Sequence, residues 1–291
     1  MSSSPISNKK VTSSVFRAKK ERGEPITMLT AYDFLTARAV DLSGIDSILV
    51  GDSLGMVVLG YENTLPVTME DMLHHCKAVA RGASNALLIG DMPFMSYQVS
   101  PSEALRNAGR FLQEAGMDAV KLEGGRARLD AVRAIVGSGI PVLGHLGLTP
   151  QSVNQLGGFK AQGRIADEAG EILADALALE DAGCFGIVLE SIPSRLAEYI
   201  SNKLTIPTIG IGAGPGCDGQ VLVTHDLLGL FDKFTPKFVK QYKVLHQEIH
   251  HAFQEYKIDV EGGNFPGKEH TFSMSDQEWQ KFLDLTVDSR I

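Results

Sequence analysis

The sequence predicts a (β/α)8 barrel of the TIM type. The first observation is that short, apolar, β-branched runs alternate with amphipathic helical patterns along most of the chain. The second is that seven strand-like runs are clear and residues 220–223 can supply an eighth. The third is that acidic residues stand where several of these runs end, and the carboxyl ends of barrel strands form the active-site face of this fold.

The expected elements follow one another in regular order. The predicted strands cover 26–33, 47–52, 86–91, 118–123, 141–145, 185–190, 207–212 and 220–223. The predicted helices between them cover 33–43, 69–81, 101–115, 129–136, 166–181 and 194–202. Helix 101–115 has clear ends, because Ser100 can cap it with Glu103 three residues on and Gly116 can end it. Right-handed crossovers then give a closed parallel barrel rather than an open sheet, with the last unit least regular.

The two ends of the chain are expected to be additions to a barrel domain at 10–258. Residues 1–9 are Ser-rich, with no apolar run of the kind found in a secretory signal, and are predicted to be a flexible tail. A helix at 12–21 can close the bottom of the barrel, and a long charged helix is predicted at 237–256. Because exposed aromatics are costly, Phe265, Phe272 and Trp279 indicate that a C-terminal extension, 259–291, packs on the barrel or on a neighbouring subunit.

Composition narrows the class of function. The formal charge of −8 disfavours binding to nucleic acid or to an anionic membrane, and no apolar run approaches the length of a membrane span. Cys76, Cys184 and Cys217 are far apart and form no CxxC pair, so they are expected to be reduced thiols of a cytoplasmic protein. An ordinary globular enzyme acting on small molecules is the natural expectation.

Asp52, Asp91 and Glu123 end three successive predicted strands, so a barrel would bring their carboxylates to one mouth. Like charges at about 4 Å repel by roughly 4 kcal/mol at an effective dielectric of about 20, and a bound cation would remove that conflict. Oxygen ligands without a nearby His or Cys pair favour Mg²⁺ over Zn²⁺. For any one of these acids, a helix cap or an ion pair is the alternative interpretation.

Three further strand residues are candidates for chemistry. Lys121 shares a strand face with Glu123, so it can bind a carboxylate or enolate oxygen, form a Schiff base, or make a structural salt bridge. Glu190 ends the sixth strand and is a candidate general base, the alternative being a carboxylate at the helix terminus near Ser194. His145 ends the fifth strand and is either packed or functional, and we place it with the substrate-binding candidates.

Two glycine-rich segments follow the fifth and seventh strands. Residues 157–164 are a candidate mobile lid. Residues 210–216 contain four glycines that let the backbone approach a ligand, and a phosphate site after strands seven and eight is common in this fold. The second segment is neither a P-loop nor a dinucleotide-binding fingerprint, so it is weak support for a phosphate site.

Six of these motifs in one order resemble the ketopantoate hydroxymethyltransferase family over about residues 10–260. The matching segments are 48–53, 91–94, 120–125, 144–151, 157–164 and 209–223. The resemblance implies transfer of a hydroxymethyl group from 5,10-methylenetetrahydrofolate to 3-methyl-2-oxobutanoate, giving 2-dehydropantoate in pantothenate biosynthesis. It also implies one Mg²⁺ per subunit, which the keto acid chelates for enolate formation, and a homo-oligomer, often a decamer.

The resemblance also assigns roles by position. It implies that Asp52, Asp91 and Glu123 serve the metal, Glu123 directly or through a water. Asp52, Ser53, Asp91 and Lys121 contact the keto acid, and Glu190 accepts the proton. Two alternatives stay open. One is a Mg²⁺-dependent lyase or mutase of the phosphoenolpyruvate mutase and isocitrate lyase group, although no cysteine here lies in that group's Lys-Lys-Cys-Gly-His loop. The other is a non-catalytic barrel that binds keto acids.

Overall fold

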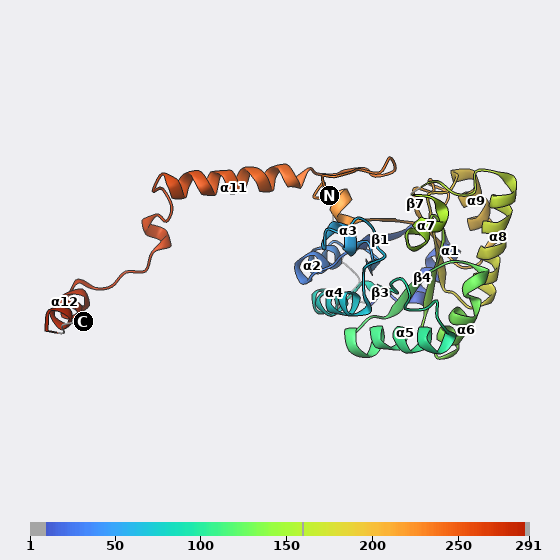
Figure 1. The fold of residues 1–291 in the computed structure, drawn as a ribbon, viewed down its shortest axis with the longest axis horizontal. Coiled ribbons are helices and arrows are strands. Elements are labelled where there is room, and N and C mark those ends of the chain that lie inside the picture. Colours follow the sequence, from blue (N-terminus) through green and yellow to red (C-terminus); the bar gives the residue numbers. More distant parts are fainter. Residues whose placement is uncertain (1–9, 159, 289–291) are drawn as a thin grey trace. The chain divides into compact units, whose positions relative to one another are not determined.

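Eight parallel strands close into a barrel in chain order, from β1 to β8, with β8 pairing back to β1. The computed structural model describes residues 10–158 and 160–288, so the predicted tail at 1–9 lies outside the described residues. The closed parallel barrel predicted from the sequence is confirmed (Figure 1). The strands are β1 (Ile26–Thr30), β2 (Ser47–Val50), β3 (Leu87–Asp91), β4 (Ala119–Glu123), β5 (Val142–Gly147), β6 (Gly186–Glu190), β7 (Thr208–Ile211) and β8 (Gly219–Leu222).

The principal helices of the barrel match the predicted ones within a few residues. They are α1 (Ser13–Arg22), α2 (Phe34–Leu42), α4 (Met69–Gly82), α5 (Pro101–Ala115), α6 (Leu129–Gly137), α8 (Ala166–Asp181) and α9 (Ser194–Lys203). The ends of α5 are those expected: Ser100 accepts from the Glu103 N–H at 3.2 Å, and Gly116 has a left-handed φ of 69°. Short helices that the sequence did not predict also lie at the strand ends: α3 (Leu54–Val57), η1 (Arg126–Arg128), η2 (Pro150–Ser152), α7 (Val153–Leu156) and α10 (Thr224–Leu227).

Helix α1 closes the amino end of the barrel, as predicted. Its Phe16 is fully buried in the cluster that fills the barrel interior, which includes Ile26 and Leu87. Lys19 pairs with Asp46 at 2.6 Å, and Lys20 pairs with Asp218 at 2.8 Å. One apolar side chain and two partly buried ion pairs therefore hold this helix against the end of the barrel opposite the carboxyl ends of the strands.

Two predicted elements have bounds that differ from the structure by three residues or more. Strand β1 ends at Thr30 rather than at 33, because Asp33 caps α2 by accepting from the Thr36 N–H at 2.9 Å. The helix expected at 237–256 is α11 (Leu245–Glu261). Residues 237–243 are not helical, and the Tyr242 N–H donates to the Leu227 carbonyl at 2.8 Å. A tertiary hydrogen bond thus takes the place of a helical one in this segment.

The chain divides into two compact units, and the division falls between Lys243 and Val244. The sequence placed it at 258/259, a position that lies inside α11. The second unit contains α11, η3 (Lys268–His270) and α12 (Asp276–Asp288), and none of the side chains described in α11 is buried. Within it, Trp279 stacks on Phe282 with ring centroids 5.3 Å apart. The packing partner of residues 259–291 stays a prediction.

Candidate active site

The carboxyl ends of β2, β3 and β4 bring three buried carboxylates together. Asp91 and Glu123 are the last residues of β3 and β4, and Asp52 follows β2 by two residues. Their relative exposures are 4% for Asp52, 1% for Asp91 and 4% for Glu123, and the Asp52 N–H donates to Asp91 Oδ2 at 3.1 Å. The strand-end acids predicted to meet at the barrel mouth are therefore neighbours in one buried cluster.

Lys121 lies within this cluster, two residues before Glu123 on β4. Its Nζ donates to Asp91 Oδ1 at 2.6 Å and lies 3.8 Å from Glu123 Oε1. The inward orientation expected for this pair is thus observed. Burial acts to lower the pKa of Lys121, but the carboxylates of Asp91, Glu123 and Asp52 outweigh it and raise the pKa above its ordinary value. Lys121 therefore carries a protonated ammonium held by Asp91. Because a Schiff base requires a neutral amine, this arrangement does not favour a Schiff-base role.

The Lys121 ammonium does not balance three carboxylates, and the pKa values of two of them, Asp52 and Asp91, are raised. Burial, followed by the charges of Asp91 and Glu123, raises the pKa of Asp52 well above 3.8. Burial also raises the pKa of Asp91, although the Lys121 ammonium opposes it. In Glu123, burial is outweighed by His145 and Lys121, and the pKa falls. A buried cluster of this kind has an unmet requirement for positive charge.

The oxygen atoms in this cluster suit a hard divalent cation as ligands. Glu123 Oε1 is buried and has no hydrogen-bond partner, and Asp52 and Asp91 also offer carboxylate oxygens. Mg²⁺ prefers oxygen ligands and retains several waters. Among residues 10–158 and 160–288, no three His, Cys, Asp or Glu side chains form a ready-made metal cage. Water or substrate oxygens would have to complete the coordination, and the three-residue metal set stays a prediction.

His145 on β5 connects this cluster to Glu190 at the end of β6. Its Nδ1 lies 3.4 Å from Glu123 Oε1, and its Nε2 lies 3.2 Å from Glu190 Oε2. Neither nitrogen has an aligned hydrogen bond, so both contacts are best described as ion pairs. Burial and the Lys121 charge act to lower the pKa of His145, but Glu123 and Glu190 outweigh them and raise it to about 9. The imidazolium therefore bridges two carboxylates of different strands.

We expect His145 to titrate near pH 9 rather than near its ordinary value of 6.5. Its raised pKa implies that its contribution to stability is fully present below pH 6.5 and is lost as the pH rises through about 9. Carbon-13 labelling of the imidazoles, with His145→Gln to assign the resonance, measures the pKa by NMR. Glu190→Gln should lower that value, and a pKa at or below 6.5 in the unmodified protein would contradict the bridge.

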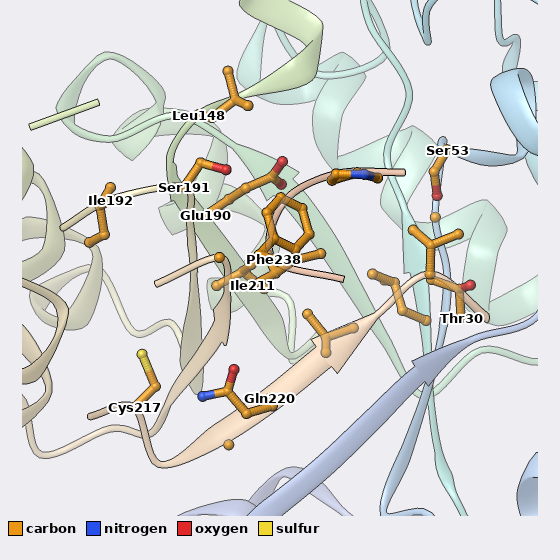
Figure 2. Close-up of a pocket in the computed structure, with 18 of the residues that line it drawn as sticks. Thr30, Ser53, Leu148, Glu190, Ser191, Ile192, Ile211, Cys217, Gln220 and Phe238 are labelled. Carbon is orange, nitrogen blue, oxygen red and sulfur yellow. The ribbon is translucent and has the colours of Figure 1, made fainter. Parts of the chain in front are cut away.

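A cavity of about 1750 Å³ includes the barrel mouth and extends to residues at the amino end of the barrel such as Lys20 and Ile26, so it exceeds the roughly 300–1,000 Å³ of common ligand sites. Five predicted site residues line it: Asp52, Ser53, Asp91, Lys121 and Glu190. In Figure 2, Glu190 at the end of β6 and Ser53 in the turn after β2 lie on different sides of the view. Glu123 and His145 are not among the lining residues. This placement favours a positioning role for His145 over the substrate contact that the sequence suggested.

The two glycine-rich segments differ in what they do at this cavity. Gly212 and Gly214 have left-handed φ angles of 64° and 80°, and a Cβ on Gly212 would lie 2.7 Å from the Phe238 ring. This turn therefore makes room for protein packing, and the phosphate site considered there receives no support. Ala161 and Arg164, from the predicted lid at 157–164, line the cavity. Phe159 of that segment lies outside the described residues, and closure of the lid stays a prediction.

Sequence reasoning missed three residues that organise the site. Tyr32 is buried, and its hydroxyl lies 2.8 Å from the Ser53 hydroxyl. Tyr97 and Gln151 are buried and hydrogen-bonded to each other at 2.6 Å, between Asp52 and Glu123. Tyr97 lies in the loop after β3 and Gln151 in the short helix η2 after β5, where no periodicity marks a functional side chain. Gln151 ends one of the segments that carry the family resemblance, which was the one available signal.

Comparisons with known proteins agree on one family. A sequence profile described as ketopantoate hydroxymethyltransferase matches residues 10–268. The 3-methyl-2-oxobutanoate hydroxymethyltransferase of Syntrophus aciditrophicus is 60% identical over 264 residues, covering 91% of this chain and 97% of that protein. The protein of the same name from Enterococcus faecalis is 55% identical over 272 residues, covering 94% of this chain and 99% of that protein.

Solved structures share the fold at much lower identity. A phosphonopyruvate hydrolase in complex with oxalate and Mg²⁺ has a TM-score of 0.60 at 13% identity, covering 95% of this chain and 97% of that chain. A 2,3-dimethylmalate lyase of the phosphoenolpyruvate mutase and isocitrate lyase superfamily has a TM-score of 0.57 at 17% identity, covering 94% and 95%. At such identities the likeness concerns the barrel fold alone.

Proposed function

This chain belongs to the ketopantoate hydroxymethyltransferase family, and we propose that it transfers a hydroxymethyl group from 5,10-methylenetetrahydrofolate to 3-methyl-2-oxobutanoate, giving 2-dehydropantoate. The observation that carries this proposal is the composition of one cavity wall. It contains an acidic cluster with an ammonium, Asp52, Asp91 and Lys121, and a separate carboxylate, Glu190. Those are the groups that removing a proton beside a keto group requires.

Asp52 and Asp91 would hold a Mg²⁺ ion, one per subunit, with Glu123 acting directly or through a water. When bound, the ion supplies a Lewis acid that polarises the keto carbonyl of the substrate. Lys121 Nζ lies beside the same carboxylates and can donate to the substrate carboxylate or to the oxygen that gains charge. Ser53, held by Tyr32, adds a hydroxyl at the cavity wall and would contact the keto acid.

Glu190 would accept the proton from carbon 3 of the keto acid. The C–H electron pair then forms the new bond to the methylene carbon carried by the folate, and water supplies the hydroxyl oxygen of the product. Both C–N bonds of that carbon break, and tetrahydrofolate leaves with one proton from carbon 3 and one from the water on its two nitrogens. His145 holds the Glu190 carboxylate from behind, with Nε2 at 3.2 Å. A placed general base contributes about 10²–10⁴-fold to such a step.

Family membership extends the proposal beyond the site. By family resemblance we infer that the reaction belongs to pantothenate biosynthesis and that the protein is a cytoplasmic homo-oligomer, a decamer. No nucleic acid and no membrane would be partners, in keeping with the formal charge of −8. Among the described residues, every helix falls short of the length and apolarity that crossing a bilayer demands.

Two assays test the proposal against its alternatives. Purified protein with Mg²⁺, 3-methyl-2-oxobutanoate and methylenetetrahydrofolate should form 2-dehydropantoate, and it should not cleave 2,3-dimethylmalate or isocitrate. Without folate, it should still exchange the deuterium of 3-²H-labelled keto acid with solvent, which a barrel that only binds keto acids would not do. Cleavage without transfer would favour the lyase, and binding without exchange would favour the non-catalytic barrel.

A further inference from the structure

We propose that Gln151 is a positioning residue that holds Asp52 and Glu123 in place for a divalent cation, and that Tyr97 sets the direction of its amide. This inference rests on the cation site of the proposed function. Gln151 is the second residue of η2, directly after the loop that follows β5, and its relative exposure is 5%. It does not line the cavity, so it acts through the carboxylates and not on the substrate.

Gln151 joins the carboxyl ends of three neighbouring strands. Its Nε2 donates to Asp52 Oδ2 after β2 and to the Met92 carbonyl after β3, both at 3.0 Å. Its backbone N–H donates to Glu123 Oε2 at the end of β4, also at 3.0 Å. Both side-chain N–H groups and the backbone N–H are therefore used at the site. Few side chains other than an amide offer this set of donors without adding charge.

The choice of a neutral donor matters for binding a cation. Asp52 and Glu123 repel each other, and an unrestrained pair would rotate apart in the absence of a cation. A Lys or Arg at position 151 would place a positive charge against Asp52 and neutralise it. Gln151 instead engages one oxygen of each carboxylate, Asp52 Oδ2 and Glu123 Oε2, and leaves their charge in place. The other oxygen of Glu123, Oε1, is buried without a hydrogen-bond partner.

Tyr97 determines which way the amide faces. Its phenolic oxygen accepts from the Glu123 N–H at 3.2 Å, so its own proton points to Gln151 Oε1, 2.6 Å away. Gln98 Nε2 lies 3.3 Å from the same amide oxygen. A flipped amide would set Oε1 against Asp52 Oδ2 and the Met92 carbonyl, both of which are acceptors. The network is therefore satisfied in one orientation, with the donors toward Asp52.

Calorimetric titration with Mg²⁺, and electron paramagnetic resonance with Mn²⁺, measure the affinity of the full chain without substrate. The variants are Gln151→Met, which keeps the length but removes the amide, Tyr97→Phe, and the two combined. The matched control is Gln155→Met, an exposed glutamine in α7 of the same segment. Circular dichroism melts of metal-free samples show whether each variant is folded.

Loss of a residue that orients metal ligands typically weakens metal binding about 10–100-fold, and we expect that range for Gln151→Met. Tyr97→Phe should weaken binding less, and the double variant should bind no more weakly than Gln151→Met alone, because both act through one network. Gln155→Met should bind as the unmodified protein does. If Gln151→Met fails to fold, Tyr97→Phe carries the test, and unchanged affinity in that variant overturns the proposal.

Unchanged affinity in a folded Gln151→Met variant would also overturn it, while leaving the cation site of the proposed function intact. If the loss of affinity in the double variant equals the product of the losses in the two single variants, the two residues act independently, and the role given to Tyr97 is overturned. If the unmodified protein binds neither ion, both the cation site and the role of Gln151 are wrong. A loss of stability with undiminished affinity would identify Gln151 as a structural residue only and would likewise refute the proposal.

Discussion

Glu190→Gln is expected to abolish exchange of the hydrogen at carbon 3 of 3-methyl-2-oxobutanoate, with a fall of about 10²–10⁴-fold. The amide has nearly the shape of the carboxylate but cannot accept the proton. Because the Glu190 side chain is 16% exposed and stands apart from the Asp91–Lys121 salt bridge, Mg²⁺ affinity should change little. Proton NMR in deuterium oxide, without folate, follows the exchange directly, and calorimetry follows the ion.

Asp226 provides a matched control for this prediction. It lines the same cavity, and burial raises its pKa to about 6, which suits a general base on electrostatic grounds alone. It comes from α10, away from the Glu123–His145–Glu190 chain of contacts. Asp226→Asn should therefore retain exchange. Exchange at the unmodified rate in Glu190→Gln, together with its loss in Asp226→Asn, would transfer the role of base to Asp226.

Asp52→Asn should have opposite effects on binding and on stability. Removing a carboxylate from the cluster is expected to weaken Mg²⁺ binding by more than about 100-fold, beyond the loss for an outer-shell residue. The same change should stabilise the metal-free protein, since burial and the charges of Asp91 and Glu123 raise the pKa of Asp52 well above 3.8 and make its ionised form unfavourable there. Calorimetry and urea denaturation in chelator measure the two effects.

The pH dependence follows from the direction of that shift. An acid whose pKa is higher in the folded state binds its proton more tightly there, so metal-free protein should gain stability as the pH falls through the raised pKa toward 3.8. Asp52→Asn should remove this gain. A variant whose unfolding free energy keeps the same pH profile, or whose Mg²⁺ affinity is unchanged, would contradict the assignment of Asp52.

Asp41 is the matched control, because it is a buried aspartate whose pKa is lowered in the folded protein, whereas that of Asp52 is raised. Its burial is outweighed by hydrogen bonds from the Ser84, Asn85 and Ala86 N–H groups, and its pKa is lowered. Its contribution is present above pH 3.8 and is lost as the pH falls through the lowered pKa. Asp41→Asn should therefore destabilise the protein, the reverse of Asp52→Asn, and should leave Mg²⁺ binding unaffected.

The barrel and the acidic residues at its strand ends could be predicted from local sequence patterns. Asp91, Glu123 and Glu190 end β3, β4 and β6, and strand ends in a parallel barrel all face one mouth. The capping of α5 by Ser100 and its end at Gly116 are also local, because they depend on residues within one helical turn. Neighbouring residues are enough to specify such features.

Contacts between distant segments could not be predicted in this way. Residues 237–243 are irregular, with the Tyr242 N–H bonded to the Leu227 carbonyl, and the glycine turn after β7 accommodates Phe238. His145 lies between Glu123 and Glu190, which no local pattern indicated, and its contact with substrate stays a prediction. Each of these depends on a partner far away in the sequence.

The sequence by itself determined the closed barrel, the helix that plugs it and the acidic mouth, because period, caps and strand ends are set by residues close together. Only the tertiary structure decided how that mouth is organised. It placed Lys121 against Asp91, His145 between two carboxylates, and Gln151 across three strands. The physical reason is that buried charges and amides are stable only with partners in the right geometry, and those partners come from separate turns of the barrel.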